Sequence, residues 1–561
     1  MTGEMLFAAL GGVEQKYLKD LDLLYRTKPS WRKIVKKSIS WTGKLVTAAA
    51  VAVVVLGLVF LPGLFQRQEE LAPGAAISDE PVVIKVLSEM GTQNGVSANS
   101  KIPENLGKIV SDFNLSHDQI RVEMSYLPID ENERKMALQN LRTQIMSGEG
   151  PDVFLLPTGG TSVNHSVDKN GQLNVVHAQT LFSDVELAMR NLYFADLSEY
   201  YDADFDLNTE ELQQDIMDAG VLDGARYVLP LGFDMPMTVV DLGNLTALGL
   251  GTEIFSQGVM GTYGAIRAAG ERAETDLERE QILFSILPPG SSLSLFPQVF
   301  DYEKEESAIS REDWETLIDF YQEGYDIENA QLGLQVMLNT GSKLYGWNAM
   351  LYSKAGYKSM FELGMPMVDA SLGQNAADVL GTTRTAGREA EVYPVRAIDG
   401  SLVAEVTYYG AVSAACEHPA QAYEFLRTFL TPAVQFQGRI SSGESLFLDI
   451  EDYSWPVRVV GSAQAKWGAA RQKIGVSLTW NGTEHVNDNE RVLALQETTL
   501  SDEDFSFLLG KIDHVRFSIY GEDNLTPWAL LHEDHPSHME RTPEEAVKIA
   551  MDLLDYHIAE S

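Results

Sequence analysis

Cysteine and basic residues are scarce in this chain. Its 561 residues include a single cysteine, Cys416, so neither an intramolecular disulfide nor a cysteine-based zinc site can form. Lys and Arg number 42 against 81 Asp and Glu, which gives a formal net charge of −39. Because such a surface repels phosphate backbones, general nucleic-acid binding is disfavoured.

Reaction motifs are missing as well. The sequence contains no G-x-x-x-x-G-K-[ST], no H-E-x-x-H and no G-x-S-x-G, and its carboxylates are too numerous to single out a glycosidase pair. His532, His535 and His538 are closely spaced, but Pro536 disfavours a regular helix through them. A solvated loop is therefore favoured over a metal site, and we expect a protein that is not an enzyme and has no cofactor.

One long apolar run is present. Residues 45–65 carry no charge over 21 positions, and a helix of that length covers about 31 Å, so we predict a transmembrane anchor. Nine basic and four acidic residues precede the run. By the positive-inside rule, the N-terminus is then cytoplasmic and the remainder is extracellular, on a single-pass protein of the cell membrane. A cleaved signal peptide is the alternative, although the region before the run is unusually long for one.

Residues 1–44 form the predicted cytoplasmic stub. Apolar residues recur there every three or four positions, which predicts one face of an amphipathic helix: Leu6, Leu10, Val13, Tyr17, Leu21 and Leu24. This helix lies on the inner leaflet or docks a cytoplasmic partner, and the sequence leaves both open. Residues 66–80 are polar with Pro and small residues, as is typical of a linker.

Strand and helix patterns alternate after the linker. Residues 81–88, 121–127 and 153–157 predict strands, and residues 101–113 and 131–147 predict helices. This βαβαβ order indicates a parallel sheet covered by helices. Ligands of such sheets lie beyond the carboxyl ends of the strands, so loops 88–99, 127–131 and 157–165 face a candidate site. The last of these holds Thr158 and Gly159, which suit a polar small molecule, although a plain loop explains them equally well.

Five segments resemble the extracellular solute-binding proteins of ABC importers, the family that includes maltose-binding protein. They are LRTQIMSGEGPDVFLLP (141–157), FADLSEYYDAD (194–204), DGARYVLPLGFDMPMTVVD (223–241), VAEVTYYGAVSAACEHPAQAYEFLRTFLTPAVQFQ (403–437) and RTPEEAVKIAMDLLDYHIAES (541–561). Order and spacing are similar to the family over about residues 80–561. Residues 438–530 match it poorly, and the family's usual lipid anchor is replaced here by the predicted helix.

The resemblance implies an α/β, two-lobed, periplasmic-binding-protein-like (type II) fold. Lobe 1 would comprise residues 81–236 plus 406–450, and lobe 2 residues 240–400 plus 455–561. Two or three crossing strands would join the lobes, and hinged closure would bury a ligand between them. ABC permease subunits are then the implied partners.

Aromatic and polar residues near the predicted crossings are the candidate ligand contacts. Sugars stack their C–H faces on aromatic rings and bond their hydroxyls to planar polar groups. The candidates are Tyr408, Tyr409, Trp347, Tyr345, Phe233, Trp455 and Asp234, together with Thr158 and Gly159. Core packing is the alternative for each aromatic residue, and a surface turn is the alternative for Asp234.

The predicted function is an extracellular receptor that delivers a carbohydrate, a di- or oligosaccharide, to an ABC importer. One alternative is a sensor that signals through the anchor to a cytoplasmic partner of residues 1–30. A second alternative is a cell-surface enzyme that acts on glycosides.

Overall fold

The computed structural model describes the chain beyond residue 80, with gaps. The described residues are 81–89, 104–128, 131–159, 161–167, 173–178, 180–283, 293–328, 361–362, 364–372, 376–437, 455–458, 503–519, 525–531 and 541–560. The chain divides into two compact units, Met1–Pro81 and Val82–Ser561, and the elements below belong to the second. The predicted stub, anchor and linker lie outside the described residues, as do His532, His535 and His538.

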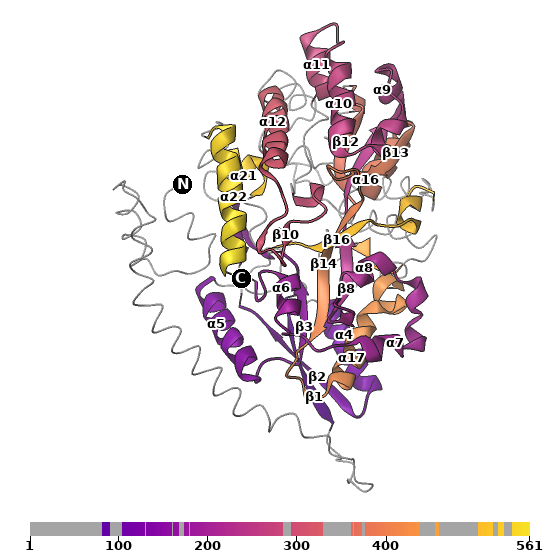
Figure 1. Ribbon diagram of the computed structural model, residues 1–561. Helices are drawn as coiled ribbons and strands as arrows, with labels where there is room; N and C mark the ends of the chain where they lie inside the picture. Colours follow the sequence, from indigo (N-terminus) through magenta and orange to yellow (C-terminus); the bar gives the residue numbers. More distant parts are fainter. Residues whose placement is uncertain are drawn as a thin grey trace, which may run out of the picture. The chain divides into compact units, whose positions relative to one another are not determined.

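The predicted βαβαβ unit is confirmed. Strands β1 (Val82–Ser88), β2 (Ile120–Tyr126) and β3 (Val153–Pro157) are parallel in the order β2-β1-β3. The helices α4 (Glu104–Ser116) and α5 (Glu131–Ser147) connect them. Right-handed crossovers in opposite directions along the sheet place these helices on opposite faces, as Figure 1 shows.

Helix α5 ends where the sequence predicts, at Gly148. This residue has φ of +76°, a left-handed conformation that glycine adopts without steric cost. Its N–H donates to the carbonyl of Ile145 at 3.1 Å, and the N–H of Glu149 donates to that of Gln144 at 2.9 Å. The chain then enters β3, whose five residues are all buried, as a strand covered on both faces must be.

Four further strands complete a seven-stranded sheet around β14 (Val403–Val412). Strands β3 and β8 (Val228–Asp234) are antiparallel to β14, whereas β16 (His514–Phe517) is parallel to it. Strand β15 (Trp455–Pro456) pairs with the far side of β8. Helix α17 (Pro419–Arg427) packs against β14 and β1.

The second sheet has three antiparallel strands. Their order is β12 (Met367–Ser371), β9 (Pro236–Asp241) and β13 (Ala390–Pro394). Because side chains alternate across a strand, Thr238 and Asp369 share one face of this sheet. Helix α10 (Val259–Gly270) covers that face, and α16 (Ala376–Thr385) packs on the same sheet.

A two-stranded hairpin and a pair of long helices are also present. Residues of β4 (Thr161–Val167) and β5 (Leu173–Ala178) form an antiparallel hairpin. The predicted loop 157–165 is therefore wrong at its end, since β4 starts at Thr161. Helices α12 (Arg311–Glu328) and α22 (Pro543–Glu560) pack against each other, and the latter confirms the predicted C-terminal helix.

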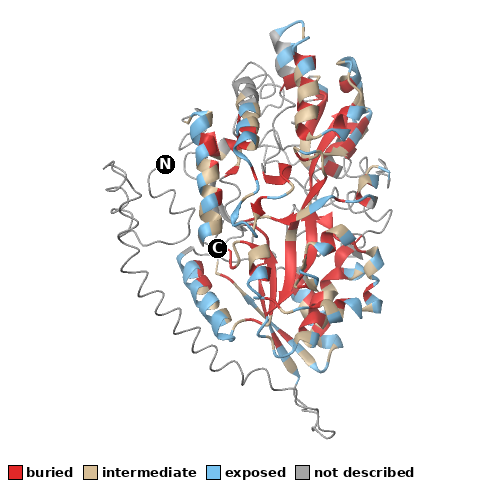
Figure 2. Ribbon diagram, in the orientation of Figure 1, coloured by how far each residue is buried: buried red, intermediate tan, exposed pale blue. Residues whose placement is uncertain are grey.

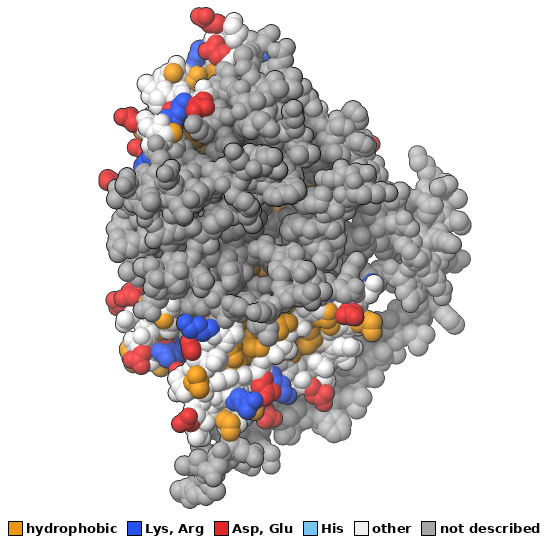
Figure 3. All heavy atoms as spheres, turned by 180° about the vertical axis from the view of Figure 1, so that it is seen from behind, with side chains coloured by type: hydrophobic (Ala, Val, Ile, Leu, Met, Phe, Trp, Pro, Cys, Tyr) orange, Lys and Arg blue, Asp and Glu red, His pale blue; other side chains and the backbone are white. Residues whose placement is uncertain are grey.

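The buried apolar side chains of the described residues form two clusters. One surrounds the larger sheet and continues to one side of the smaller sheet. The other lies among α10, α12 and α22 and includes Val240 and Met367 from the opposite side of the smaller sheet. Figure 2 shows the central strands of the larger sheet buried and the outer helix faces exposed. On the face in Figure 3, the described acidic and basic side chains are interspersed.

Two segments of the described chain connect the two sheets: Met235 separates β8 from β9, and residues 395–402 separate β13 from β14. A third crossing leads from β16 to the second apolar cluster, since Phe517 and Ile519 belong to different clusters. The prediction placed a third crossing near Trp455, but Trp455 pairs with Phe233 inside the larger sheet. The α/β class and the crossing of strands between two sheets agree with the predicted two-lobed fold.

The crossings join two parts of the molecule. The larger-sheet region comprises the described residues of 82–234, 403–437, 455–458 and 503–517. The smaller-sheet region comprises those of 236–394 and 519–560. Residues 455–458 and 503–517 thus lie with the larger sheet, whereas the sequence prediction had grouped them with lobe 2.

No helix among the described residues is both long enough and apolar enough to cross a bilayer. The predicted span, residues 45–65, is not among them, so it stays a prediction.

Gly220, between α8 (Gln214–Asp218) and β8, leaves no room for a side chain. A Cβ atom there would lie 1.9 Å from the carbonyl oxygen of Val228. We expect Gly220→Ala to lower the free energy of unfolding by about 3 kcal/mol. Gly264→Ala is the control, because a Cβ atom in that turn of α10 meets nothing within 4 Å, and it should stabilise by about 0.5–1 kcal/mol. Chemical denaturation checks both, and equal effects would contradict the packing described.

Candidate functional site

Charged side chains gather where the parallel strands end and the crossing strands begin. We call this set, which comprises Glu89, Arg134, Asp234, Glu405 and Arg516, the crossing-strand site. Glu89 follows the last residue of β1, Arg134 lies on α5, and the other three lie on β8, β14 and β16. The site is at the carboxyl edge of β1 and β3, where ligands of open α/β sheets bind.

Glu89 and Arg134 form a buried ion pair. Their side chains are 1% and 3% exposed, and Arg134 Nη2 donates to Glu89 Oε1. The backbone N–H of Glu89 donates to the carbonyl of Leu155 at 3.0 Å, which fixes the carboxylate beside β3. Burial raises the pKa of Glu89, and the guanidinium of Arg134 opposes that rise. The pair therefore ties the carboxyl end of β1 to helix α5.

Asp234, Glu405 and Arg516 form a row across three strands. Glu405 is directly opposite Asp234 on β8 and Arg516 on β16, and residues paired in this way project from the same face of a sheet. Arg516 Nη2 donates to Glu405 Oε1. Glu405 Oε2 accepts from Ser518 Oγ at 3.1 Å, and Asp234 Oδ1 accepts from the N–H of Met235 at 2.8 Å. Side chains from all three strands thus meet at two of the crossings.

Thr158 and Gly159 lie beside this row. Thr158 donates its N–H to the carbonyl of Thr407 at 3.0 Å and its hydroxyl to that of Val406. Gly159 has φ of +75°, and a Cβ atom there would lie 3.0 Å from Cβ of Ser518. These predicted ligand contacts therefore join β3 to β14 and to the residues after β16. Their role toward a ligand stays a prediction.

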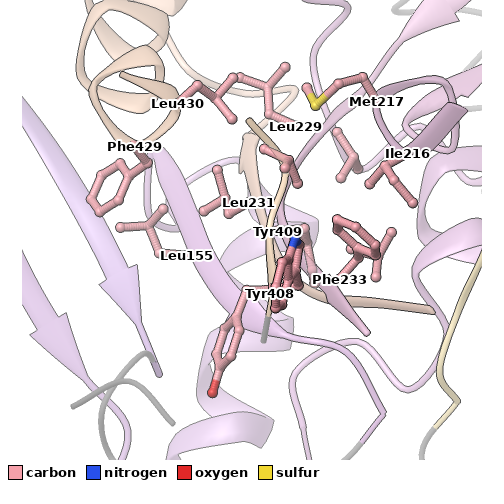
Figure 4. Close-up of a cluster of buried hydrophobic side chains, with 14 of the residues drawn as sticks. Leu155, Ile216, Met217, Leu229, Leu231, Phe233, Tyr408, Tyr409, Phe429 and Leu430 are labelled. Atoms are coloured by element: carbon pink, nitrogen blue, oxygen red, sulfur yellow. The ribbon is translucent and has the colours of Figure 1, made fainter. Parts of the chain in front are cut away.

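The predicted aromatic contacts lie in the apolar core of the larger sheet. Phe233, Tyr408, Tyr409 and Trp455 are each no more than 2% exposed, and Figure 4 shows the first three close together. The ring of Tyr409 lies 6.3 Å from those of Phe194 and Phe517, and the ring of Trp455 lies 5.2 Å from Phe505. The structure thus brings four of the six aromatic candidates together in core packing. Tyr345 and Trp347 lie outside the described residues.

Sequence reasoning missed Glu89, Arg134, Glu405 and Arg516. A signal was present for Glu405, because it is the one charged residue in the strand VAEVTYYGAV. An isolated charge in an apolar strand has to find a partner when the strand is buried. The partner of Glu405 could not be predicted from the sequence, because Arg516 is 111 residues away along the chain.

A second buried carboxylate lies on the smaller sheet. Asp369 Oδ1 is buried and accepts no hydrogen bond within the described part of the chain. Beside it is a cavity of about 10 Å³, with room for about one water molecule, whose lining includes Thr238 and Tyr263. Burial raises the pKa values of Asp369 and Tyr263 well above their ordinary ranges.

The chemistry open to the crossing-strand site is hydrogen bonding. Arginine and carboxylate groups offer several donors and acceptors in fixed geometry, which matches a polyhydroxylated solute. Among the described residues, no three His, Cys, Asp or Glu side chains are arranged to hold a metal ion.

Loss of Arg134 should destabilise the fold strongly. Arg134→Leu takes the guanidinium from a buried carboxylate, a change that costs about 3–5 kcal/mol. The control is Arg311→Leu, because the pair of Arg311 and Glu315 is about half exposed and should contribute about 0.5 kcal/mol or less. Unfolding in urea measures both, and the double variant E89L/R134L should recover most of the loss. Equal costs for the two arginines would show that Glu89 is not buried as described.

Removal of the charge at Asp369 should change how stability depends on pH. An acid whose pKa is raised by folding destabilises the folded state as pH rises above its unfolded value, about 4. Asp369→Asn should therefore raise the thermal midpoint at pH 7–8 and change it little at pH 4. Exposed Asp206 supplies the control variant D206N, for which no such difference is expected. Parallel pH profiles for D369N and the parent would contradict the burial of this carboxyl.

Comparison with known proteins gives matches among solved structures. No protein-family model matches the chain, and no curated protein matches it.

Three of the similar structures are sugar- or solute-binding proteins. An extracellular solute-binding protein of family 1 from Alicyclobacillus acidocaldarius is 10% identical, with 86% of this chain and 100% of that chain covered and a TM-score of 0.42. An ABC substrate-binding protein from Listeria monocytogenes, in complex with cycloalternan, is 14% identical, with 86% and 100% covered and a TM-score of 0.41. The sugar-binding protein MalE from Xanthomonas citri is 12% identical, with 85% and 98% covered and a TM-score of 0.46. The similar structures thus include an extracellular solute-binding protein, the class that the sequence motifs resemble.

Proposed function

We propose that this chain is an extracellular receptor that binds a carbohydrate and delivers it to an ABC importer by hinged closure of two lobes. The observation that carries the proposal is the row of Asp234, Glu405 and Arg516 at the point where strands cross between two sheets. A solute held there would touch both the larger-sheet region and the crossing segments. Binding would then be coupled to the angle between the two regions.

Short crossings support a hinge. A hinge needs only a few residues that absorb changes in φ and ψ. Met235 alone separates β8 from β9, and Ser518 alone lies between the two apolar clusters at the third crossing. The regions on either side would move as bodies while these residues rotate, and the ligand would shift the population toward the closed arrangement.

The donors and acceptors of the site support a polar, uncharged solute. Sugar hydroxyl groups both donate and accept hydrogen bonds. A carboxylate can accept from such a hydroxyl, and a guanidinium group can donate to it. Among the similar solved structures, one holds cycloalternan and another holds lacto-N-biose. Those compounds therefore make suitable first probes.

Attachment to the membrane is part of the proposal. The uncharged run 45–65 would anchor the chain, with residues 1–44 in the cytoplasm and the binding regions outside. A permease would then meet the receptor at the outer surface. Deletion of residues 1–30 with the anchor kept should leave sugar uptake intact, whereas a loss of sugar-dependent signalling would favour the sensor.

Thermal-shift measurements on the full chain test the ligand class. Cycloalternan, lacto-N-biose and mannobiose would be compared with amino acids and polyamines. At a hundredfold excess over Kd, a specific ligand stabilises by about 2.7 kcal/mol, which raises the thermal midpoint. A response to polyamines alone would refute the carbohydrate assignment, and chromatography that finds the sugar converted to products would show an enzyme.

The site itself is tested by substitution at Asp234. We expect Asp234→Ala to weaken binding of the responding sugar by at least about tenfold, as loss of a hydrogen bond to a charged group does. Titration calorimetry measures the affinity. Asp206→Asn changes an exposed acid of the same region and should leave it unchanged. Equal affinities for the two variants would show that the sugar does not bind at the crossing-strand site.

A further inference from the structure

Contacts away from the crossing strands also join the two regions, and one group of them involves helix α6. Asp184 and Arg190 lie at the two ends of α6 (Val185–Arg190), whose buried residues belong to the cluster of the larger sheet. Phe300 lies in β10 (Phe300–Asp301), Tyr302 follows it, and His557 lies in the last turn of α22, all in the smaller-sheet region. In Figure 1, α6, β10 and α22 lie on the same side of β14.

Polar and ring contacts connect these five residues. Tyr302 Oη donates to Asp184 Oδ2 at 2.5 Å, and His557 Nε2 lies 3.4 Å from the same oxygen. The guanidinium carbon of Arg190 lies 5.0 Å from the ring centroid of Tyr302, within the range of a cation–π contact. The rings of Phe300 and His557 stack at 5.0 Å and 3°.

Each group is held in place by its own region. Asp184 is 4% exposed, and its Oδ1 accepts from the N–H of Leu187 at 3.0 Å, which caps α6. Arg190 Nη2 donates to Glu186 Oε1 at 2.8 Å on the same helix. Opposite them, stacking on Phe300 orients His557. The contact is therefore assembled from two pre-formed halves.

Such a contact is sensitive to movement. A hydrogen bond to a carboxylate depends on distance and angle and weakens steeply when either departs from its optimum. An apolar interface would tolerate small shifts of one region against the other, whereas this hydrogen bond is lost when the two regions shift. Burial, with the neighbouring Asp184, raises the pKa of Tyr302, so the phenol is protonated and can donate to Asp184.

We propose that the bond between Asp184 and Tyr302, supported by Arg190 and His557, is a latch that holds the two regions in the arrangement seen here. The strength of the latch sets the fraction of chains in that arrangement without any ligand. This last step rests on the proposed function: if the chain binds a solute between the two regions, the apparent affinity for that solute depends on the same fraction.

Pulsed electron–electron distance measurements on the full chain test the latch. Cys416→Ser removes the native thiol. Met146→Cys on α5 and Glu271→Cys after α10 place one spin label on an exposed site of each region. Tyr302→Phe removes only the hydroxyl. We expect the population at the label distance of the arrangement seen here, divided by the population at other distances, to fall at least about tenfold. Arg190→Gln should shift the ratio in the same direction by a smaller factor.

Tyr423→Phe is the matched control. It removes a tyrosine hydrogen bond to an aspartate, from Tyr423 Oη to Asp204 Oδ2 at 3.0 Å, that lies wholly within the larger-sheet region. Its distance distribution should match that of the parent. If Tyr302→Phe and Arg190→Gln also give the parent distribution, the latch is refuted. Because no ligand is present, a shifted distribution combined with no sugar binding would keep the latch and discard the proposed function.

Discussion

The hydrogen bonds of strand β14 hold the structure together. One half of this strand pairs with β3, the other half pairs with β16, and β8 runs along its opposite edge. Because β14 enters from the smaller-sheet region, its first residues reach the carboxyl edge of β1 and β3. The charged row at the crossings is a direct result of that path, since Glu405 can meet both Asp234 and Arg516 only from the middle position.

Buried and partly buried carboxylates of two kinds occur in the described part of this protein. Glu89 and Glu405 face arginines, so their desolvation is offset by Coulomb attraction and hydrogen bonds. Asp369 has no such partner within the described chain, and its raised pKa marks the neutral acid as the favoured form. Both of these paired carboxylates lie close to the crossings.

Local patterns in the sequence were enough to predict the framework. The boundaries of α5 and β3 follow from helix formers ended by Gly148 and from an apolar run after Pro151. The site could not be predicted in the same way, because pairing of Glu405 with Arg516 depends on the register of strands far apart in the chain. Trp455 shows the converse problem, since a tryptophan in a short segment gives no sign of whether it packs in the core or faces a ligand. Its burial against Phe505 depends on a segment 50 residues later.

The position of β16 also determines when the larger sheet can be completed. Its first strand begins at Val82, but the strand that fills the last place beside β14 ends at Phe517. A folding chain can form the β2-β1-β3 unit early, since its contacts are local. It has to keep the open edge of β14 unpaired until nearly all of its length has been synthesised. Unpaired edges invite association with other chains, so the late arrival of β16 leaves a folding chain open to aggregation at that edge.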